Sequence, residues 1–257
     1  MSTIRVQRED RVATLSLSNP GKLNAIDVFM WESLRREFEA LSADTELRCV
    51  IVRGEDGNFA AGADIAEFAQ VRSTPEQALH YHNEVIAPAL QAIAGCLHPT
   101  VAAIDGVCVG GGLEIACACD LRLAAPEAHF GIPINRLGFP LAPGELQGLL
   151  QLIGKARTLE ILLEGRVFNA AEAKEKGLLH RIEHDVRTAA QECAQRIANG
   201  APLAARINKQ MARRLTPQAE ALSSDEMRAA FSWVASQDYR DGVQSFLNKQ
   251  APNFQGK

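Results

Sequence analysis

The spacing of hydrophobic and polar residues changes from one segment of this chain to the next. Residues 3–17 contain two short segments, IRVQRE and RVATLSL, separated by Asp10, and this pattern predicts two strands joined by a turn. After Asp27 the apolar positions recur every three or four residues, as on one face of a helix: Trp31, Leu34, Phe38 and Leu41. That spacing predicts an amphipathic helix.

The middle of the chain alternates between the two patterns. Thr74 as N-cap and Pro75 at the first helical position predict a helix that reaches Leu97 with a bend at Pro88. The other expected elements are a helix from the glycines to Asp120 and strands at 49–54, 100–104, 107–109, 121–125 and 129–132. Alternating strands and helices indicate an α/β layered domain.

Beyond about residue 145 the helical period dominates. Helices are expected at 146–153, 156–163, 170–176, 187–198, 202–213 and 220–250. No internal repeat or low-complexity linker separates this part from the rest. It is therefore expected to pack on the core or on a neighbouring subunit.

Composition narrows the class of partner. The 257 residues are 47% hydrophobic, and 27 basic against 31 acidic residues give a formal charge of -4 without a block of like charge. That balance argues against nucleic acid or an anionic membrane surface and favours a small molecule. The six cysteines show no metal-ligand spacing and are expected to be reduced core residues. A polar N-terminus and the lack of a long apolar run favour a cytoplasmic protein.

The stretch GGGLEIACACD (110–120) carries the most informative chemistry. A glycine-rich turn that enters a helix offers free N–H groups and the positive end of the helix dipole, which favour an anion or a developing oxyanion. Neither dinucleotide nor phosphate-loop spacing fits, because Ile115 stands where a glycine is needed and no Gly-Lys-Ser/Thr follows. Glu114 would repel phosphate but could transfer a proton beside a carbonyl that becomes anionic only in the transition state.

An oxyanion site normally uses two donors, and FAAGADI (59–65) is a second small-residue loop that opens a helix. Together the two loops indicate enolate chemistry. The alternative interpretation is tight helix–strand packing at the glycines, with Glu114 a first-turn carboxylate that complements the dipole.

Several motifs together resemble the enoyl-CoA hydratase/isomerase (crotonase) superfamily. They are FAAGADI (59–65), GGGLE (110–114) with Cys119-Asp120, SNPGKLNA (18–25), HFGIP (129–133), FNAAEA (168–173), DGVQSFLNK (241–249) and PNF (252–254). The resemblance covers nearly the whole chain. It implies a spiral of ββα units with a helical C-terminal trimerisation region, divided at residues 1–195 and 196–257, and a trimer or a dimer of trimers.

The resemblance also implies roles for individual residues. The N–H groups of Ala63 and Gly111 would bind the thioester oxygen of an acyl-CoA, and Glu114 would take the place of the first catalytic glutamate. The residues on stretches that hold CoA would be Lys22, Leu23, Ala25, Ala61, Asp64 and Ile65. Phe246 and Lys249 lie where a neighbouring subunit's helix can close over CoA, although an ordinary amphipathic terminal helix is the alternative.

One position departs from the family pattern. A family hydratase carries a second glutamate twenty residues after the first, and here Ile134 occupies that place beside the expected acyl pocket. Isoleucine cannot transfer a proton. Either Glu114 manages both transfers through the water, or Glu145 in LAPGE (141–145) is a displaced acid, or the enzyme performs one-acid chemistry. For Glu145 the alternative is a helix-start charge that faces solvent.

These observations predict an acyl-CoA lyase, most simply an enoyl-CoA hydratase of fatty acid metabolism that needs no metal and no cofactor beyond the coenzyme A of its substrate. The alternatives are an enoyl-CoA isomerase, a hydroxyacyl-CoA dehydratase, a malonyl-type decarboxylase, or a catalytically silent CoA-binding scaffold. Each enzyme among them would use the same oxyanion site.

Overall fold

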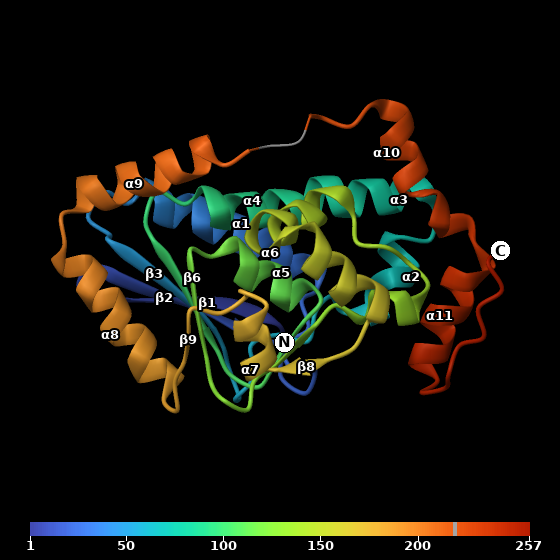
Figure 1. Cartoon of the computed structure of the whole chain (residues 1–257), viewed down its shortest axis with the longest axis horizontal. Helices are drawn as coiled ribbons and strands as arrows, with labels where there is room; N and C mark the ends of the chain where they lie inside the picture. The colour runs from blue at the N-terminus through green and yellow to red at the C-terminus, as the bar shows by residue number, and fades with distance from the viewer. Residues whose placement is uncertain (218–219) are drawn as a thin grey trace.

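The computed structural model describes residues 1–217 and 220–257. Its main sheet has six strands in the order β1-β2-β3-β4-β6-β9, and a smaller sheet has the order β5-β7-β8 (Figure 1). The β1–β2 and β7–β8 pairs are antiparallel and the others are parallel. The strands are β1 Thr3–Glu9, β2 Val12–Ser18, β3 Cys49–Gly54, β4 Thr100–Ile104, β5 Val107–Val109, β6 Leu121–Ala124, β7 His129–Gly131, β8 Phe168–Asn169 and β9 Arg181–Ile182.

Helices fill most of the remaining chain. The α-helices are α1 Val28–Ala43, α2 Phe68–Val71, α3 Pro75–His80, α4 Ala87–Gly95, α5 Gly111–Ala118, α6 Pro143–Glu164, α7 Ala170–Glu175, α8 Val186–Asn199, α9 Pro202–Leu215, α10 Ser224–Ala230 and α11 Gln237–Leu247. Four shorter helical segments are η1 Ile65–Glu67, η2 Tyr81–Ile86, η3 Pro133–Leu137 and η4 Ser232–Ala235; η2 is a π-helix and the other three are 3₁₀ turns.

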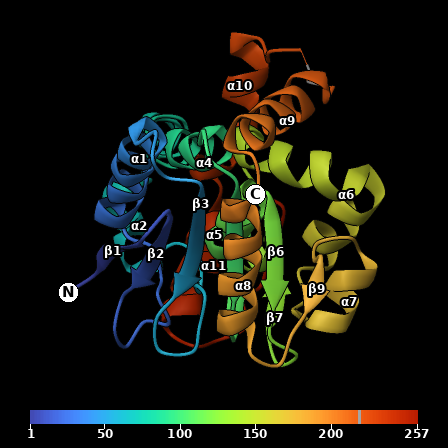
Figure 2. The ribbon, with the colours of Figure 1, turned by 90° about the vertical axis from the view of Figure 1, so that its left-hand side faces the viewer.

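Both faces of the main sheet are covered, because side chains alternate along each strand. On β3, Cys49 and Ile51 face the cluster that α8 supplies, whereas Val50 and Val52 face the larger core. Figure 2 shows α8 in front of the main sheet, whereas α1 and α4 supply side chains to the larger core. Near-continuous apolar strands are typical of parallel sheets buried on both faces, and the predicted α/β layering is confirmed.

The predicted helix at 74–97 is interrupted before its proline. Thr74 caps α3 as expected, but Tyr81–Ile86 forms a π-helix before α4 resumes with Pro88 in its first turn. Proline has no N–H to return to the preceding turn, so the wider turn lies immediately upstream of it. This π-helix carries the buried side chain of His82.

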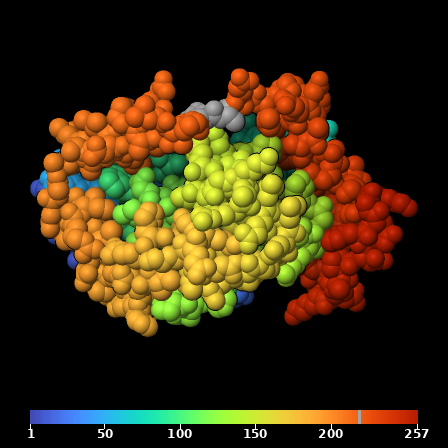
Figure 3. Space-filling model, in the orientation of Figure 1, coloured from blue at the N-terminus to red at the C-terminus, as the bar shows by residue number. Residues whose placement is uncertain are grey.

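The C-terminal part departs from the sequence prediction in two ways. The expected boundary at residue 195 falls inside α8, which packs on the sheet, so the chain leaves the sheet only after Gly200. The expected continuous helix at 220–250 is wrong, because the helix is interrupted at Phe231 and again at Ser236. The side chain of Ser236 caps α11. Figure 3 shows this C-terminal segment covering one end of the molecule.

Two further features concern the helices. The predicted break between helices at 146–153 and 156–163 is confirmed, because α6 consists of two helical stretches that meet at Gly154, whose φ of 74° and ψ of 169° are not helical. Among the described residues, none of the helices is both long enough and apolar enough to cross a membrane.

Candidate active site

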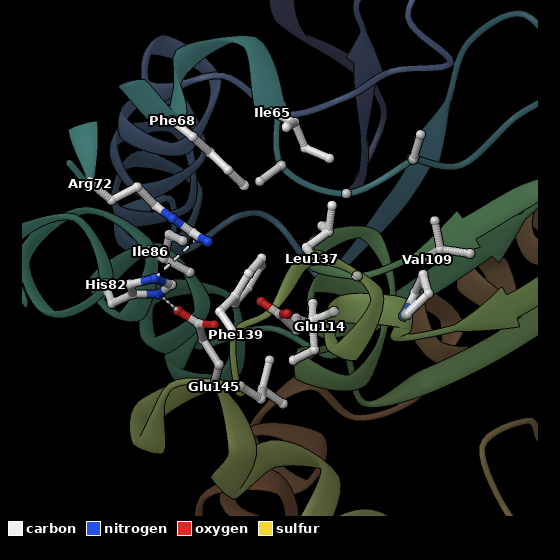
Figure 4. A pocket seen from close by; sticks show the side chains of 18 of the residues that line it. Ile65, Phe68, Arg72, His82, Ile86, Val109, Glu114, Leu137, Phe139 and Glu145 are labelled. Atoms are coloured by element: carbon white, nitrogen blue, oxygen red, sulfur yellow. Dashed lines mark hydrogen bonds and ion pairs between the residues drawn. The ribbon is translucent and has the colours of Figure 1, made fainter. Parts of the chain in front are cut away.

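A cavity of about 410 Å³ lies where the small sheet, α5 and the start of α6 meet. Most of the side chains that line it are apolar, among them Ile65, Phe68, Ile86, Leu137, Phe139 and Leu141. The ionisable residues on its wall are Arg72, His82, Glu114, Arg136 and Glu145. Figure 4 shows the carboxyl groups of Glu114 and Glu145 pointing toward the same part of the cavity.

Two loops form one wall, and we name them the amide cradle (residues 60–65 and 110–112). The first loop pairs with β5 through the bond from the N–H of Val109 to the carbonyl of Ala60, at 3.1 Å. Gly62 and Gly110 have φ values of 92° and 52°, in the region that favours glycine. A Cβ at Gly112 would lie 2.4 Å from the Ala60 carbonyl oxygen. Glycine is therefore required by backbone geometry and close approach.

The cradle brings the two predicted oxyanion donors together. A Cβ built at Gly111 would lie 3.6 Å from the Ala63 nitrogen, and one built at Gly62 would lie 3.4 Å from the Gly111 nitrogen. Within the described chain neither the Ala63 nor the Gly111 N–H donates to a protein acceptor. Gly111 begins α5, where the helix leaves its first N–H groups unpaired. Both groups are available to a ligand oxygen.

The loop with the predicted CoA residues lies directly against the cradle. The Ala61 N–H donates to the Leu23 carbonyl at 2.9 Å, and the Asp64 N–H donates to that of Ile26 at 2.9 Å. The Lys22 ammonium lies 2.5 Å from the Asp64 carboxylate, which also caps the turn that begins at Ile65. This hydrogen bond and the Asp64 charge raise the pKa of Lys22.

The structure therefore brings the predicted CoA residues of the 18–25 and 60–65 loops into one region. Ala25 is buried and donates its N–H to the Lys22 carbonyl at 2.9 Å, while Leu23 is exposed. Ala61 and Ile65 line the cavity.

Glu114 lies in the first turn of α5, and only 7% of its surface is exposed. Burial raises the pKa of its carboxyl well above the usual range, and the nearby Glu145 charge raises it further, while Arg72 acts in the opposite direction. A raised pKa favours the protonated carboxyl, which can act as a proton donor.

Glu145 lies in the first turn of α6 and is also buried, with 6% exposed, so it does not face solvent. His82 Nδ1 lies 2.5 Å from its Oε1 atom. On the other side of the ring, Arg72 Nη1 lies 3.4 Å from His82 Nε2. Since a guanidinium only donates hydrogen bonds, Nε2 must accept, and Nδ1–H donates to Glu145. We name these three residues the Glu145 chain.

The remaining predicted site residues differ in position. Ile134 lines the cavity from η3, so an apolar wall stands where a second glutamate would be. Phe246, on α11 of the same chain, also lines the cavity, whereas Lys249 is exposed and is absent from the described lining. Trp31 lies in the core and packs against Gly111, where an added Cβ would come within 2.9 Å of its ring.

Sequence reasoning missed Arg72 and His82. Arg72 lies between two short helices without any motif, and no catalytic motif surrounds His82 in the sequence. His82 lies three and four residues before the apolar Val85 and Ile86, on the same helical face, and a polar residue on that face was the available signal. Neither residue could be related to Glu145 without the fold, because 63 residues separate His82 from Glu145.

Taken together, the fold and the cavity describe an α/β protein in which two unpaired backbone N–H groups lie near buried carboxyl groups. A model of the family described as enoyl-CoA hydratase/isomerase matches residues 7–257. The chain belongs to this family, which is part of the crotonase superfamily.

Individual relatives cover almost the entire chain. The Mycobacterium tuberculosis protein named "Probable enoyl-CoA hydratase echA8" is 33% identical over 256 residues, which are 98% of this chain and 97% of that protein. The 2,3-dehydroadipyl-CoA hydratase of Escherichia coli is 31% identical over 260 residues and all of both chains.

Solved structures show the same fold. An enoyl-CoA hydratase/carnithine racemase from Magnetospirillum magneticum is 40% identical, with a TM-score of 0.82 over 100% of this chain and 97% of that one. A methylmalonyl-CoA decarboxylase in complex with 2-nitronate-propionyl-CoA is 26% identical, with a TM-score of 0.88 over 99% of this chain and 98% of that one. The predicted crotonase-type fold is confirmed.

Proposed function

We propose that this protein is an enoyl-CoA hydratase, which adds water reversibly across the double bond of a 2-enoyl-CoA. The observation that carries the proposal is a second buried carboxyl group, Glu145, that shares the cavity with Glu114 although Ile134 replaces the usual glutamate. Family membership and relatives named as hydratases support it.

In the proposed reaction the amide cradle stabilises the thioester enolate. The N–H groups of Ala63 and Gly111 donate to the thioester oxygen as negative charge develops there, and the low-dielectric cavity strengthens both bonds. Residues of two neighbouring loops, 18–25 and 60–65, hold the CoA moiety: Lys22, Leu23, Ala25, Ala61, Asp64 and Ile65. No cofactor takes part, since CoA belongs to the substrate and water is the second reactant.

The two carboxyl groups divide the proton transfers. Glu145, which accepts a hydrogen bond from His82, is the base and takes a proton from water as the water oxygen adds to Cβ. Glu114, whose pKa is raised, donates its proton to Cα. The proton taken by Glu145 then passes to Glu114, so the pair returns to its starting state. Two buried carboxyls with different environments are typical of acid–base pairs.

The assembly proposed for this chain is a trimer or a dimer of trimers. Among described residues α9 buries none of its own side chains, yet one face exposes Leu203, Ile207, Met211 and Leu215. An apolar stripe of this kind on a helix away from the sheet favours contact with another subunit. In such an assembly Phe246 and Lys249 can close over CoA.

The proposed location is the cytoplasm. The cysteines are all free, which fits a reducing compartment of this kind.

The direct test is the ultraviolet absorbance of a trans-2-enoyl-CoA over time. Wild-type protein should remove the conjugated-thioester band, whereas Glu114→Gln should lose turnover while still binding CoA, and exposed Glu175→Gln should behave as wild type. Unchanged turnover in Glu114→Gln would exclude its role. CoA binding without any hydration would count against a hydratase and favour an isomerase or a silent scaffold.

A second candidate is decarboxylation of a malonyl-type acyl-CoA. The high TM-score to a methylmalonyl-CoA decarboxylase and the apolar side chain at Ile134 favour it. Release of carbon dioxide from malonyl-CoA by the wild type, with no hydration of enoyl-CoA, would replace the first proposal.

A further inference from the structure

Arg72 is a buried cation on the wall of the acyl cavity. Only 1% of its surface is exposed, and it lines the same cavity as Glu114 and Glu145 (Figure 4). Such a residue normally forms an ion pair with a carboxylate. In the described chain no acidic side chain does so with Arg72, because the imidazole of His82 stands between it and Glu145.

The hydrogen bonds of Arg72 are incomplete. Its Nε donates to the Tyr239 hydroxyl at 3.0 Å, and Nη1 approaches His82 at 3.4 Å. Nη2 is buried, and no partner for it exists among the described residues. Leaving donors of a buried charged group unpaired is costly, so the geometry requires an acceptor from elsewhere.

Aromatic rings hold the guanidinium in place. Its central carbon lies 3.7 Å from the centroid of the Phe68 ring and 4.0 Å from that of Phe139. Rings attract the cation through their faces, but they supply no hydrogen-bond acceptor in the guanidinium plane. The side chain is thus fixed on the cavity wall with one nitrogen that lacks an acceptor.

We propose that Arg72 binds a carboxylate carried by the acyl group, so that the preferred ligands are CoA monothioesters of dicarboxylic acids. A carboxylate supplies both the missing acceptor and the missing negative charge, whereas a hydroxyl or carbonyl supplies only the acceptor. A purely hydrocarbon acyl chain supplies neither. The inference rests on the proposed binding of acyl-CoA, but it does not depend on hydration.

The test compares saturated thioesters, which cannot be hydrated, by isothermal titration calorimetry. Glutaryl-CoA is matched with pentanoyl-CoA, and adipyl-CoA with hexanoyl-CoA, so that each pair differs by the terminal group and the two lengths locate the carboxylate. Wild-type protein should bind the carboxylated member of at least one pair about tenfold or more tightly, as expected for a hydrogen bond to a charged group. Equal affinity within both pairs would overturn the inference without any variant.

Variants then assign the preference to one residue. Arg72→Met should abolish it while leaving hexanoyl-CoA affinity intact, and Arg72→Lys should retain part of it. Arg136→Met removes an exposed arginine from the same cavity and is the matched control, which should keep the preference. A preference that survives in folded Arg72→Met, or disappears only in Arg136→Met, would overturn the assignment.

The outcome is separable from that of the proposed reaction. Preference for the carboxylated thioesters without hydration of any enoyl-CoA would support the role of Arg72 and contradict the proposed hydratase function. Hydration of hexenoyl-CoA without any such preference would do the opposite.

Discussion

The amide cradle and the Glu145 chain both line one cavity but are built in different ways. The cradle consists of backbone groups on two loops that hydrogen bonds and glycine geometry hold together. The Glu145 chain consists of side chains from three separate places: the end of α2, the π-helix and the start of α6. The comparison shows that one site can combine a local, motif-encoded half with a half that only the tertiary fold creates.

This difference explains what the sequence could reveal. Runs such as GGGLE predict a cradle, because positive φ and close backbone approach restrict those positions to glycine. Most strands and helices were likewise predictable from apolar periodicity. The contact between His82 and Glu145 left no local pattern, since it depends on how α6 packs beside the π-helix. The break of the C-terminal helix at Ser236 was also missed, because a single capping serine competes poorly with a long periodic pattern.

The largest expected effect is the loss of turnover on replacing Glu145, in the half of the site that side chains form. Glu145→Gln keeps the shape of the side chain but cannot accept a proton from water, so turnover of trans-2-enoyl-CoA should fall by about 10²- to 10⁴-fold. Steady-state absorbance assays measure this, with CoA affinity as the control. A decrease below threefold would mean that Glu114 manages both transfers.

The next effect concerns the cradle. Gly111→Pro removes one oxyanion donor and should lower the rate by about 10²- to 10³-fold. Any side chain at this position meets the Trp31 ring, at 2.9 Å from the new Cβ. Gly111→Ala therefore introduces the same crowding but keeps the N–H, and it separates the two causes. Equal rates in the two variants would show that packing, rather than the lost donor, limits activity.

A smaller effect on turnover tests whether His82 positions Glu145. His82→Leu removes the donor to Glu145 and should slow turnover by up to about tenfold, the value of one hydrogen bond. His82→Asn retains an N–H near the same place and should restore part of the rate. If both variants are equally impaired, the imidazole acts by filling space.

The smallest effect is on stability and follows from the raised pKa of Glu114. The folded state holds this proton after the unfolded chain has lost it, so stability falls as pH rises from the ordinary glutamate range toward the raised value. Glu114→Gln should therefore melt higher than wild type at pH 8, by about 2–4 °C for each kcal/mol relieved. The gain should shrink toward pH 4.5, and a gain independent of pH would contradict the assignment.

The hydrogen bond from Arg72 to Tyr239 ties the wall of the cavity to the last helix of the chain. During synthesis the sheet and the amide cradle can form while the C-terminal residues are still inside the ribosome. Tyr239 and Phe246 follow all of these elements along the sequence, so the acyl site is completed only after α11 has emerged. A prematurely terminated chain would thus have a folded body that binds substrate poorly, because its anchor for Arg72 was never made.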